Sequence, residues 1–165
     1  MEIVNKVAES GLVEFNLETY YQKGEKILFD IKPHLFQELI LKEKDFRAYI
    51  KHENWSKYQD KFIAITCTAD AIVPTWAYML LAVSMQPFAK KIVFGDMSML
   101  ETILFQEVLN NLDLNNYIDK RIIIKGCSHL PVPPSAFVEL VCLLQPVAKS
   151  IMYGEACSTV PLYKK

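Results

Sequence analysis

The chain has 165 residues, the length of one domain, and a domain of this size buries roughly 70% of the surface of its unfolded chain. Its composition is 52% hydrophobic and 22% charged with a formal net charge of -1, which argues against a nucleic-acid or anionic-lipid partner. No stretch has the apolar length of a signal peptide or a membrane span, so we expect a cytoplasmic protein without membrane contact.

The chain contains four cysteines. In a cytoplasmic chain of this size, cysteines are more often thiols, metal ligands or buried side chains than disulfides. No Cys-x-x-Cys pair occurs, which argues against a thioredoxin-like protein. The glycine-rich motifs of nucleotide sites and the Gly-x-Ser-x-Gly and His-Glu-x-x-His motifs of hydrolases are also missing from the sequence. Enzymes that depend on dinucleotides or nucleoside triphosphates are therefore disfavoured.

Residues 1–60 show the weakest patterns and are expected to form short strands and helices. Segments 12–17 and 27–31 are predicted strands that form a hairpin or pair at an edge. Pro33 and Asp45 suit the first turns of two helices. His34 and His52 fall among these helices, and we expect both side chains to be solvated.

From residue 61 onward, apolar strands alternate with helices. Predicted strands cover 62–66, 91–94, 121–124 and 150–153, and predicted helices begin near residues 75, 98 and 134. This alternation predicts a parallel sheet with right-handed crossovers. We therefore expect a single α/β domain over residues 1–165, a three-layer αβα arrangement in which residues 1–60 form an N-terminal extension.

Segments 61–96 and 120–155 resemble each other at a constant offset of 59 residues, the separation of Pro133 from Pro74 (133 − 74). At this offset Gln86-Pro87 matches Gln145-Pro146, and Phe94-Gly-Asp96 matches Tyr153-Gly-Glu155. The common order of strand, loop, helix, strand, glycine and acid indicates an internally duplicated βαβ unit. A shared structural unit does not by itself indicate a shared chemistry.

Seven reactive or ligating side chains follow the four predicted strands. The carboxyl ends of parallel strands meet at one edge of a sheet, where open α/β folds bind ligands, so we expect these side chains to converge there. The set consists of Cys67, Asp70, Asp96, Cys127, His129, Glu155 and Cys157. This predicted edge is the strongest functional signal in the sequence.

The cysteines of this edge predict a metal site. Thiolates from Cys67, Cys127 and Cys157, with the His129 imidazole or a carboxylate as fourth ligand, suit tetrahedral zinc or an iron–sulfur cluster. The protein would then be an accessory or carrier protein for that metal. Each of these three cysteines has the alternative of a small buried hydrophobic side chain. Cys142 lies in the middle of a predicted helix, where we expect it to pack in the core.

Two further functions stay open. An enzyme could use Asp70, Asp96 and His129 for proton transfer in a hydrolase or transferase, or Cys127 and Cys157 as nucleophile and resolving thiol in a redox reaction. The two aspartates could instead cap the helices that follow them, and His129 could lie in an exposed turn. A non-catalytic protein could use apolar surface to form a homodimer.

Five stretches carry a resemblance to a known family. They are Leu41-Lys-Glu-Lys-Asp45-Phe-Arg47, Asp70-Ala-Ile-Val-Pro-Thr-Trp-Ala-Tyr-Met79, Val93-Phe-Gly-Asp96, Lys125-Gly-Cys127 and Gly154-Glu-Ala-Cys157-Ser-Thr-Val-Pro161. Over essentially its whole length, the chain resembles an uncharacterised bacterial family catalogued as domain of unknown function 2480. The resemblance implies no activity and no catalytic residues. From this resemblance we expect iron–sulfur assembly proteins as partners.

Overall fold

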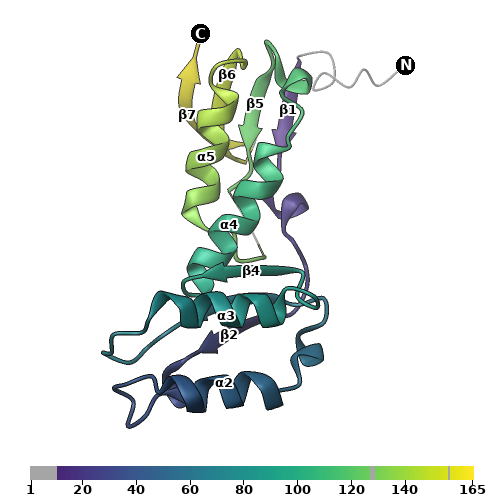
Figure 1. Cartoon of the computed structure of the whole chain (residues 1–165). Helices are drawn as coiled ribbons and strands as arrows, with labels where there is room; N and C mark the ends of the chain where they lie inside the picture. Colours follow the sequence, from purple (N-terminus) through teal and green to yellow (C-terminus); the bar gives the residue numbers. More distant parts are fainter. Residues whose placement is uncertain (1–10, 127–128, 156) are drawn as a thin grey trace, which may run out of the picture. The chain divides into compact units, whose positions relative to one another are not determined.

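The computed structural model describes residues 11–126, 129–155 and 157–165. The chain forms two compact units (Figure 1). The middle unit comprises Lys23–Glu101, and the terminal unit combines Met1–Gln22 with Thr102–Lys165. Both units contain helices and a largely parallel sheet, so the predicted α/β class is confirmed. None of the helices formed by described residues has both the length and the apolar character of a membrane span.

The middle unit is built around strand β3 (Phe62–Thr66), which lies between two parallel neighbours. The first four residues of β3 are buried, as expected for a continuous apolar run at the centre of a parallel sheet. Side chains of two helices join those of the sheet in one hydrophobic core. The other elements of this unit are β2 (Lys26–Asp30), η2 (Lys32–His34), α2 (Glu43–His52), η3 (Trp55–Tyr58), α3 (Thr75–Met85) and β4 (Lys91–Phe94).

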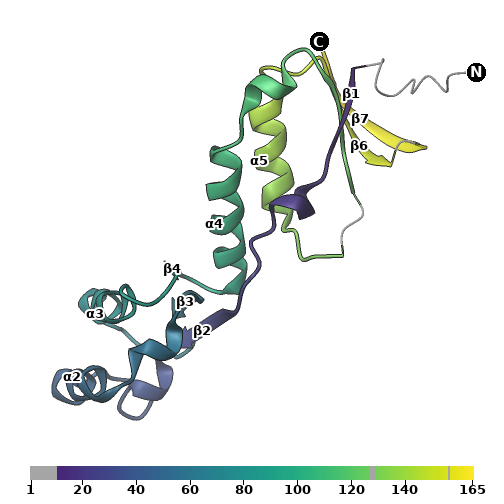
Figure 2. The ribbon, with the colours of Figure 1, turned by 90° about the vertical axis from the view of Figure 1, so that its right-hand side faces the viewer.

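The terminal unit is built in the same way around strand β5 (Arg121–Ile124), in a sheet of order β1-β5-β6-β7. Strand β7 is antiparallel to β6, whereas the other described pairings of this sheet are parallel. Helices α4 and α5 lie on the same side of this sheet (Figure 2), and side chains of both belong to its core. The other elements are β1 (Leu12–Phe15), η1 (Leu17–Tyr20), α4 (Met97–Asn110, which begins in the middle unit), η4 (Leu114–Tyr117), α5 (Pro134–Leu144), β6 (Ser150–Glu155) and β7 (Ser158–Lys164).

The strands following residue 60 belong to two sheets, and the expectation that all four share one sheet edge is wrong. Strands β3 and β4 pair in the middle unit, and β5 and β6 pair in the terminal unit. Of the two arrangements predicted for the N-terminal strands, the hairpin is absent among the described pairings, whereas the position at a sheet edge is confirmed for both strands. Instead β1 pairs in parallel with β5, and β2 pairs in parallel with β3. Each buried central strand thereby obtains a second parallel neighbour, which satisfies its backbone hydrogen bonds on both sides.

Equivalent backbone contacts recur in the two units at the 59-residue offset. The amide of Lys90 donates to the carbonyl of Lys61 over 2.8 Å, and the amide of Lys149 donates to the carbonyl of Lys120 over 2.8 Å. The correspondence extends into the helices that precede the central strands, where Phe46 of α2 and Phe105 of α4 are both buried. The structural similarity of the two units therefore extends to helices that precede segments 61–96 and 120–155.

Aromatic contacts also recur. Tyr78 and Phe94 meet edge to face with ring centroids 5.0 Å apart, and Phe137 meets Tyr153 in the same way at 5.9 Å. Edge-to-face contacts stabilise aromatic pairs beyond the burial of their surface. In this way the end of β4 packs against α3, and the end of β6 packs against α5.

Replacing either Phe46 or Phe105 by alanine should lower the free energy of unfolding by about 3–5 kcal/mol, because each ring is buried in a separate core. Denaturation with urea would measure both losses. Val138→Ala is the control, because that side chain is 66% exposed and its truncation should change stability by less than about 0.5 kcal/mol. Equal effects of all three substitutions would contradict the assignment of the cores.

Candidate functional site

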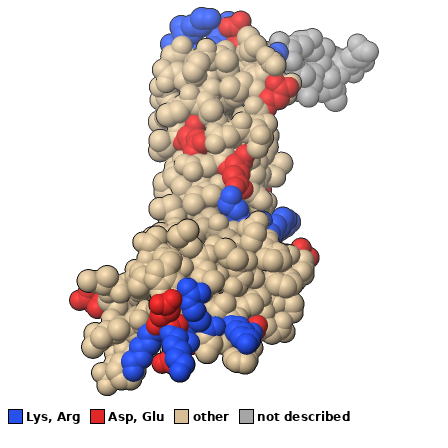
Figure 3. Space-filling view, viewed as in Figure 1, with Lys and Arg blue, Asp and Glu red and all other residues tan. Residues whose placement is uncertain are grey.

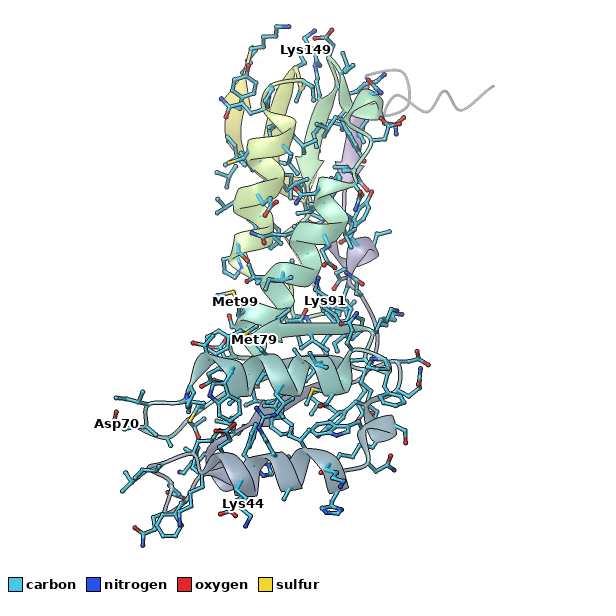
Figure 4. All side chains as sticks on the ribbon, in the orientation of Figure 1. Lys44, Asp70, Met79, Lys91, Met99 and Lys149 are labelled. Atoms are coloured by element: carbon cyan, nitrogen blue, oxygen red, sulfur yellow. The ribbon has the colours of Figure 1, made fainter. Side chains whose placement is uncertain are left out.

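In the middle unit, three of the predicted site residues follow the strands. Cys67 comes directly after β3 and is half-buried. Asp70 is exposed on the loop that leads to α3 (Figure 4). Asp96 caps α4, since its Oδ1 accepts a hydrogen bond from the amide of Met99 over 2.8 Å. The structural alternative for Asp96, a helix cap, is therefore confirmed.

In the terminal unit, the predicted residues follow two adjacent parallel strands. Ile124 of β5 is in register with Tyr153 of β6, so the two strands end at the same sheet edge, where His129 follows β5, Glu155 ends β6 and Cys157 follows it. Both His129 and Cys157 are exposed. Cys127 lies outside the described residues.

Carboxylates organise the loop and the strand ends at this edge. Glu18 accepts hydrogen bonds from the amides of His129 and Leu130, the latter over 2.9 Å. Lys125 Nζ lies 3.6 Å from Glu155 Oε2 and 3.8 Å from Glu14 Oε2. Glu155 thus forms an ion pair with Lys125. Cys157 is the better candidate for a metal ligand at this edge, because its thiol is exposed and zinc and iron–sulfur sites bind thiolates.

The predicted ligands divide between the two sheets. Cys67 belongs to the middle unit, and Cys157 and His129 belong to the terminal unit. Asp70 and His129, the proposed proton-transfer pair, are divided in the same way. Among residues 11–126, 129–155 and 157–165, no group of three or more histidine, cysteine, aspartate or glutamate side chains is placed to hold a metal ion. A zinc or iron–sulfur site with Cys127 therefore stays a prediction.

Cys142 does not pack in the core as predicted, and its side chain is exposed on α5. The buried positions of this helix are Ala136, Leu140 and Leu144. Cys142 lies between the last two of them along the chain, on the opposite side of the helix. The prediction failed because α5 is apolar on nearly all sides, so its sequence does not indicate which side faces the sheet.

A cluster of aromatic and charged side chains beside β2 was missed by sequence reasoning. His34 is stacked on Phe29 at 5.5 Å and contacts Tyr49 at 3.9 Å between ring centroids. The Tyr49 hydroxyl donates to Glu53 Oε2 over 2.9 Å, and Glu53 pairs with Lys57 over 3.0 Å. Burial is the main cause that lowers the pKa of His34, and burial also raises the pKa of Tyr49. The expectation of a solvated histidine holds for His52, which is exposed, but not for His34.

Asp30 fastens the loop after β3 to the end of β2. Its carboxylate accepts hydrogen bonds from the amides of Lys32 and Thr68, at 3.0 and 3.1 Å, and from the Thr68 hydroxyl. Burial tends to raise the pKa of Asp30, but these hydrogen bonds outweigh it and the pKa is lowered. At the same place in the terminal unit stands Asn16, whose side chain accepts from the amide of Glu18 over 3.0 Å. The role common to both residues is to fix a turn, which is a structural role.

Five pockets formed by described residues do not include the predicted site residues. Two of them have volumes of about 590 Å³, one lined by residues of η1, α4 and η4 and the other by residues of α4 and α5. Neither these two nor three smaller pockets are lined by Cys67, Asp70, Asp96, His129 or Cys157. Small-molecule enzymes enclose their reacting groups in a cavity, and none of these five pockets encloses the residues proposed for proton transfer.

Comparison with known proteins identifies a family without an assigned activity. A model of the family described as "Protein of unknown function (DUF2480)" matches residues 1–165. No curated protein and no solved structure matches the chain. The family thus supplies no residue roles, and function has to be inferred from the geometry.

His34 should make the stability of the protein depend on pH. Because its folded-state pKa lies below the ordinary value of 6.5, the unfolded chain binds the proton more readily. Its contribution is fully present above pH 6.5 and is lost as the pH falls through the lowered folded-state value. His34→Tyr introduces the residue that occupies this place in the terminal unit, where Tyr20 stacks on Phe15 at 5.1 Å.

Chemical denaturation at pH 7.5 and pH 5.5 (values set about one unit either side of the ordinary histidine pKa) would measure this effect. The wild-type protein should lose more stability between the two pH values than His34→Tyr. His52→Gln is the control, because it removes an exposed histidine of α2. Identical pH dependence in His34→Tyr and the wild type would refute the contribution.

Proposed function

Since the chain belongs to the DUF2480 family, for which no activity is described, we propose from its geometry that the protein is a non-catalytic interaction protein that forms a homodimer. The surface proposed for this contact is the outer face of α3, defined here as Thr75, Met79 and Val83 with Ile72 of the preceding loop. The observation that carries the proposal is the exposure of large apolar side chains on a helix that has no Asp, Glu, Lys or Arg.

The outer face of α3 has the composition of a buried surface. Met79 and Val83, one helical turn apart, are 63% and 69% exposed, and Ile72 is 94% exposed. A helix that is apolar on all sides normally has neighbours on all sides, whereas α3 packs on its own sheet through Ala77, Leu81 and Met85. In Figure 3, the charged side chains of this part of the molecule gather over α2, and the surface over α3 is largely free of charge.

The corresponding face of α5 supports the same interpretation more weakly. Val138 and Cys142 occupy the positions equivalent to Met79 and Val83 and are also exposed. Glu139 lies beside them and lines the same pocket. A carboxylate at the centre of a contact between identical faces would meet its own copy, and like charges in an apolar contact are unfavourable. The face of α3 is therefore the better candidate.

A second copy of the chain suits the outer face of α3 because the face is complementary to itself. Most soluble homo-oligomers have two-fold symmetry, in which the same patch of both subunits meets. Two charge-free faces can meet in this way without repulsion and without burying an unpaired charge. Flexible methionine side chains such as Met79 also adapt their shape to a facing copy.

Met79→Glu should convert the dimer into a monomer, because it would bury two unpaired carboxylates in the contact. The dissociation constant should rise by more than about tenfold, since an unpaired buried charge costs several kcal/mol. Sedimentation velocity over a range of concentrations would measure this change.

Two controls accompany this experiment. Ala48→Glu places the same charge on an exposed position of α2 and should leave the dimer intact. Val138→Glu tests the face of α5, and it should also leave the dimer intact. A wild-type chain that sediments as a monomer, or a Met79→Glu variant as dimeric as Ala48→Glu, would show the proposal to be wrong.

A metal or iron–sulfur site in the terminal unit is the second candidate function. It is favoured by the parallel pairing of β5 and β6. In sequence, Cys127 follows the end of β5, and Cys157 follows the end of β6. A Cβ at Gly126 would lie 2.7 Å from the Tyr153 hydroxyl, so the chain just before Cys127 approaches the end of β6 closely. Cys127 and Cys157 with His129 would be the ligands, and zinc or an iron–sulfur cluster fits this donor set. Cys67 lies in the other unit and is not needed for it.

For this candidate, protein purified without oxygen should contain about one zinc ion or one cluster per chain. Cys157→Ser should remove most of the metal, as measured by elemental analysis and visible absorption, because a hydroxyl is a far weaker ligand for these metals than a thiolate. Cys142→Ser is the matched control, since that thiol is also exposed but lies on α5. Equal metal content in both variants would exclude the terminal-unit site.

A further inference from the structure

A cationic pocket lies at the amino-terminal ends of β5 and β6 in the terminal unit. Its volume is about 330 Å³. Its described lining includes the cations Arg121, Lys149, Lys164 and Lys165 around the apolar side chains of Met152 and Pro161. None of the described residues that line it is acidic. Figure 3 shows blue side chains, with red ones beside them, at this end of the unit, where Figure 4 labels Lys149.

The sheet itself brings these cations together. Arg121 at the start of β5 is in register with Ser150 of β6, and Ser150 is in register with Lys164 at the end of the antiparallel β7. The amide of Lys165 donates to the carbonyl of Lys149 over 2.9 Å. Three neighbouring strands therefore fix the backbone positions from which the cationic side chains extend, so the cluster is part of the folded sheet.

The charges of the cluster are poorly balanced among the described contacts. Asp119 Oδ1 lies 3.4 Å from Lys165 Nζ, and both side chains are more than half exposed. This exposed ion pair is weak. Gathering four positive charges around one pocket in a chain whose net charge is -1 raises the local potential and attracts anions.

The middle unit shows that the shared construction does not require this cluster. At the 59-residue offset, Phe62 stands in place of Arg121, and Lys90 stands in place of Lys149. The Lys90 ammonium lies 5.2 Å from the centre of the Phe62 ring, so there the lysine has an aromatic partner. The terminal unit has a guanidinium at that place, together with the additional strand β7, which contributes Lys164.

We propose that the pocket binds a small phosphate monoester that carries an apolar or aromatic group. The guanidinium of Arg121 can donate two parallel hydrogen bonds to a phosphate, and the lysines neutralise its second charge. The apolar part of the ligand would lie on Met152 and Pro161. A volume of about 330 Å³ suits a small ligand rather than a flat surface contact. This inference is independent of the homodimer and of the metal site.

Titration of the ¹⁵N-labelled full chain with phenyl phosphate, followed by amide chemical shifts, tests the proposal. The shifts should concentrate at Arg121, Ser150 and Lys164, and phenyl phosphate should bind more tightly than inorganic phosphate because only the ester contacts the apolar side chains. Arg121→Gln and Lys149→Gln should each weaken binding about 3- to 10-fold, the loss expected for one partly exposed charge-assisted hydrogen bond. Raising the salt concentration should weaken binding as well.

Lys44→Gln is the matched control, because Lys44 is an exposed lysine of α2 in the middle unit (Figure 4) and its loss changes the net charge equally. It should leave binding unchanged. Equal weakening by Lys44→Gln and Lys149→Gln would show attraction by net charge alone and overturn the proposal. Absence of specific shifts with phenyl phosphate would overturn it too, as would binding confined to vesicles of anionic lipid, which would identify a membrane surface instead.

Discussion

The parallel pairing of two buried strands, β3 and β5, is the constraint on which the rest of the structure depends. Each is apolar on both faces and has a parallel strand on either side, β2 and β4 for one and β1 and β6 for the other. A parallel neighbour cannot be supplied by a tight turn, so it has to come from a crossover or from a distant part of the chain. The N-terminal segment supplies one strand to each sheet. The terminal unit is discontinuous in sequence for this reason.

The parallel strands and the longer helices of this fold were predictable from the sequence, but β7 and the pairing of the strands were not, and η2 replaces the longer helix expected after Pro33. Apolar runs such as 62–66 and 121–124 identify strands, and the 59-residue offset identifies similar segments. Hydrophobic periodicity does not indicate which strand lies beside which, because one long parallel sheet and two shorter ones bury the same residues. The expected convergence of seven side chains depended on a single sheet. It failed because Cys67 and Asp70 follow a strand of one sheet, whereas His129 and Cys157 follow strands of the other sheet.

The same distinction applies to single residues of the candidate sites. The cap formed by Asp96 was foreseeable because its partner, the amide of Met99, lies three residues away. The environment of His34 was not, since Tyr49 reaches it from another helix. Charged residues would have marked the solvent side of α5, but its only charged residue is Glu139. Helix α3 is similarly apolar, and its exposed face is the one proposed to contact a second copy of the chain.

The spacing of the paired strands sets an order in which the two units can close during synthesis on the ribosome. Lys26 pairs with Phe62, 36 residues later (62 − 26), whereas Leu12 pairs with Arg121, 109 residues later (121 − 12). Every strand of the middle unit has been synthesised before β5 begins, so that unit can fold first. Until β5 emerges, β1 remains a strand without its partner, and its free hydrogen-bonding groups can pair with other nascent chains. The sheet of the terminal unit can therefore form only after that of the middle unit, and β1 stays exposed to aggregation for longer than β2 does.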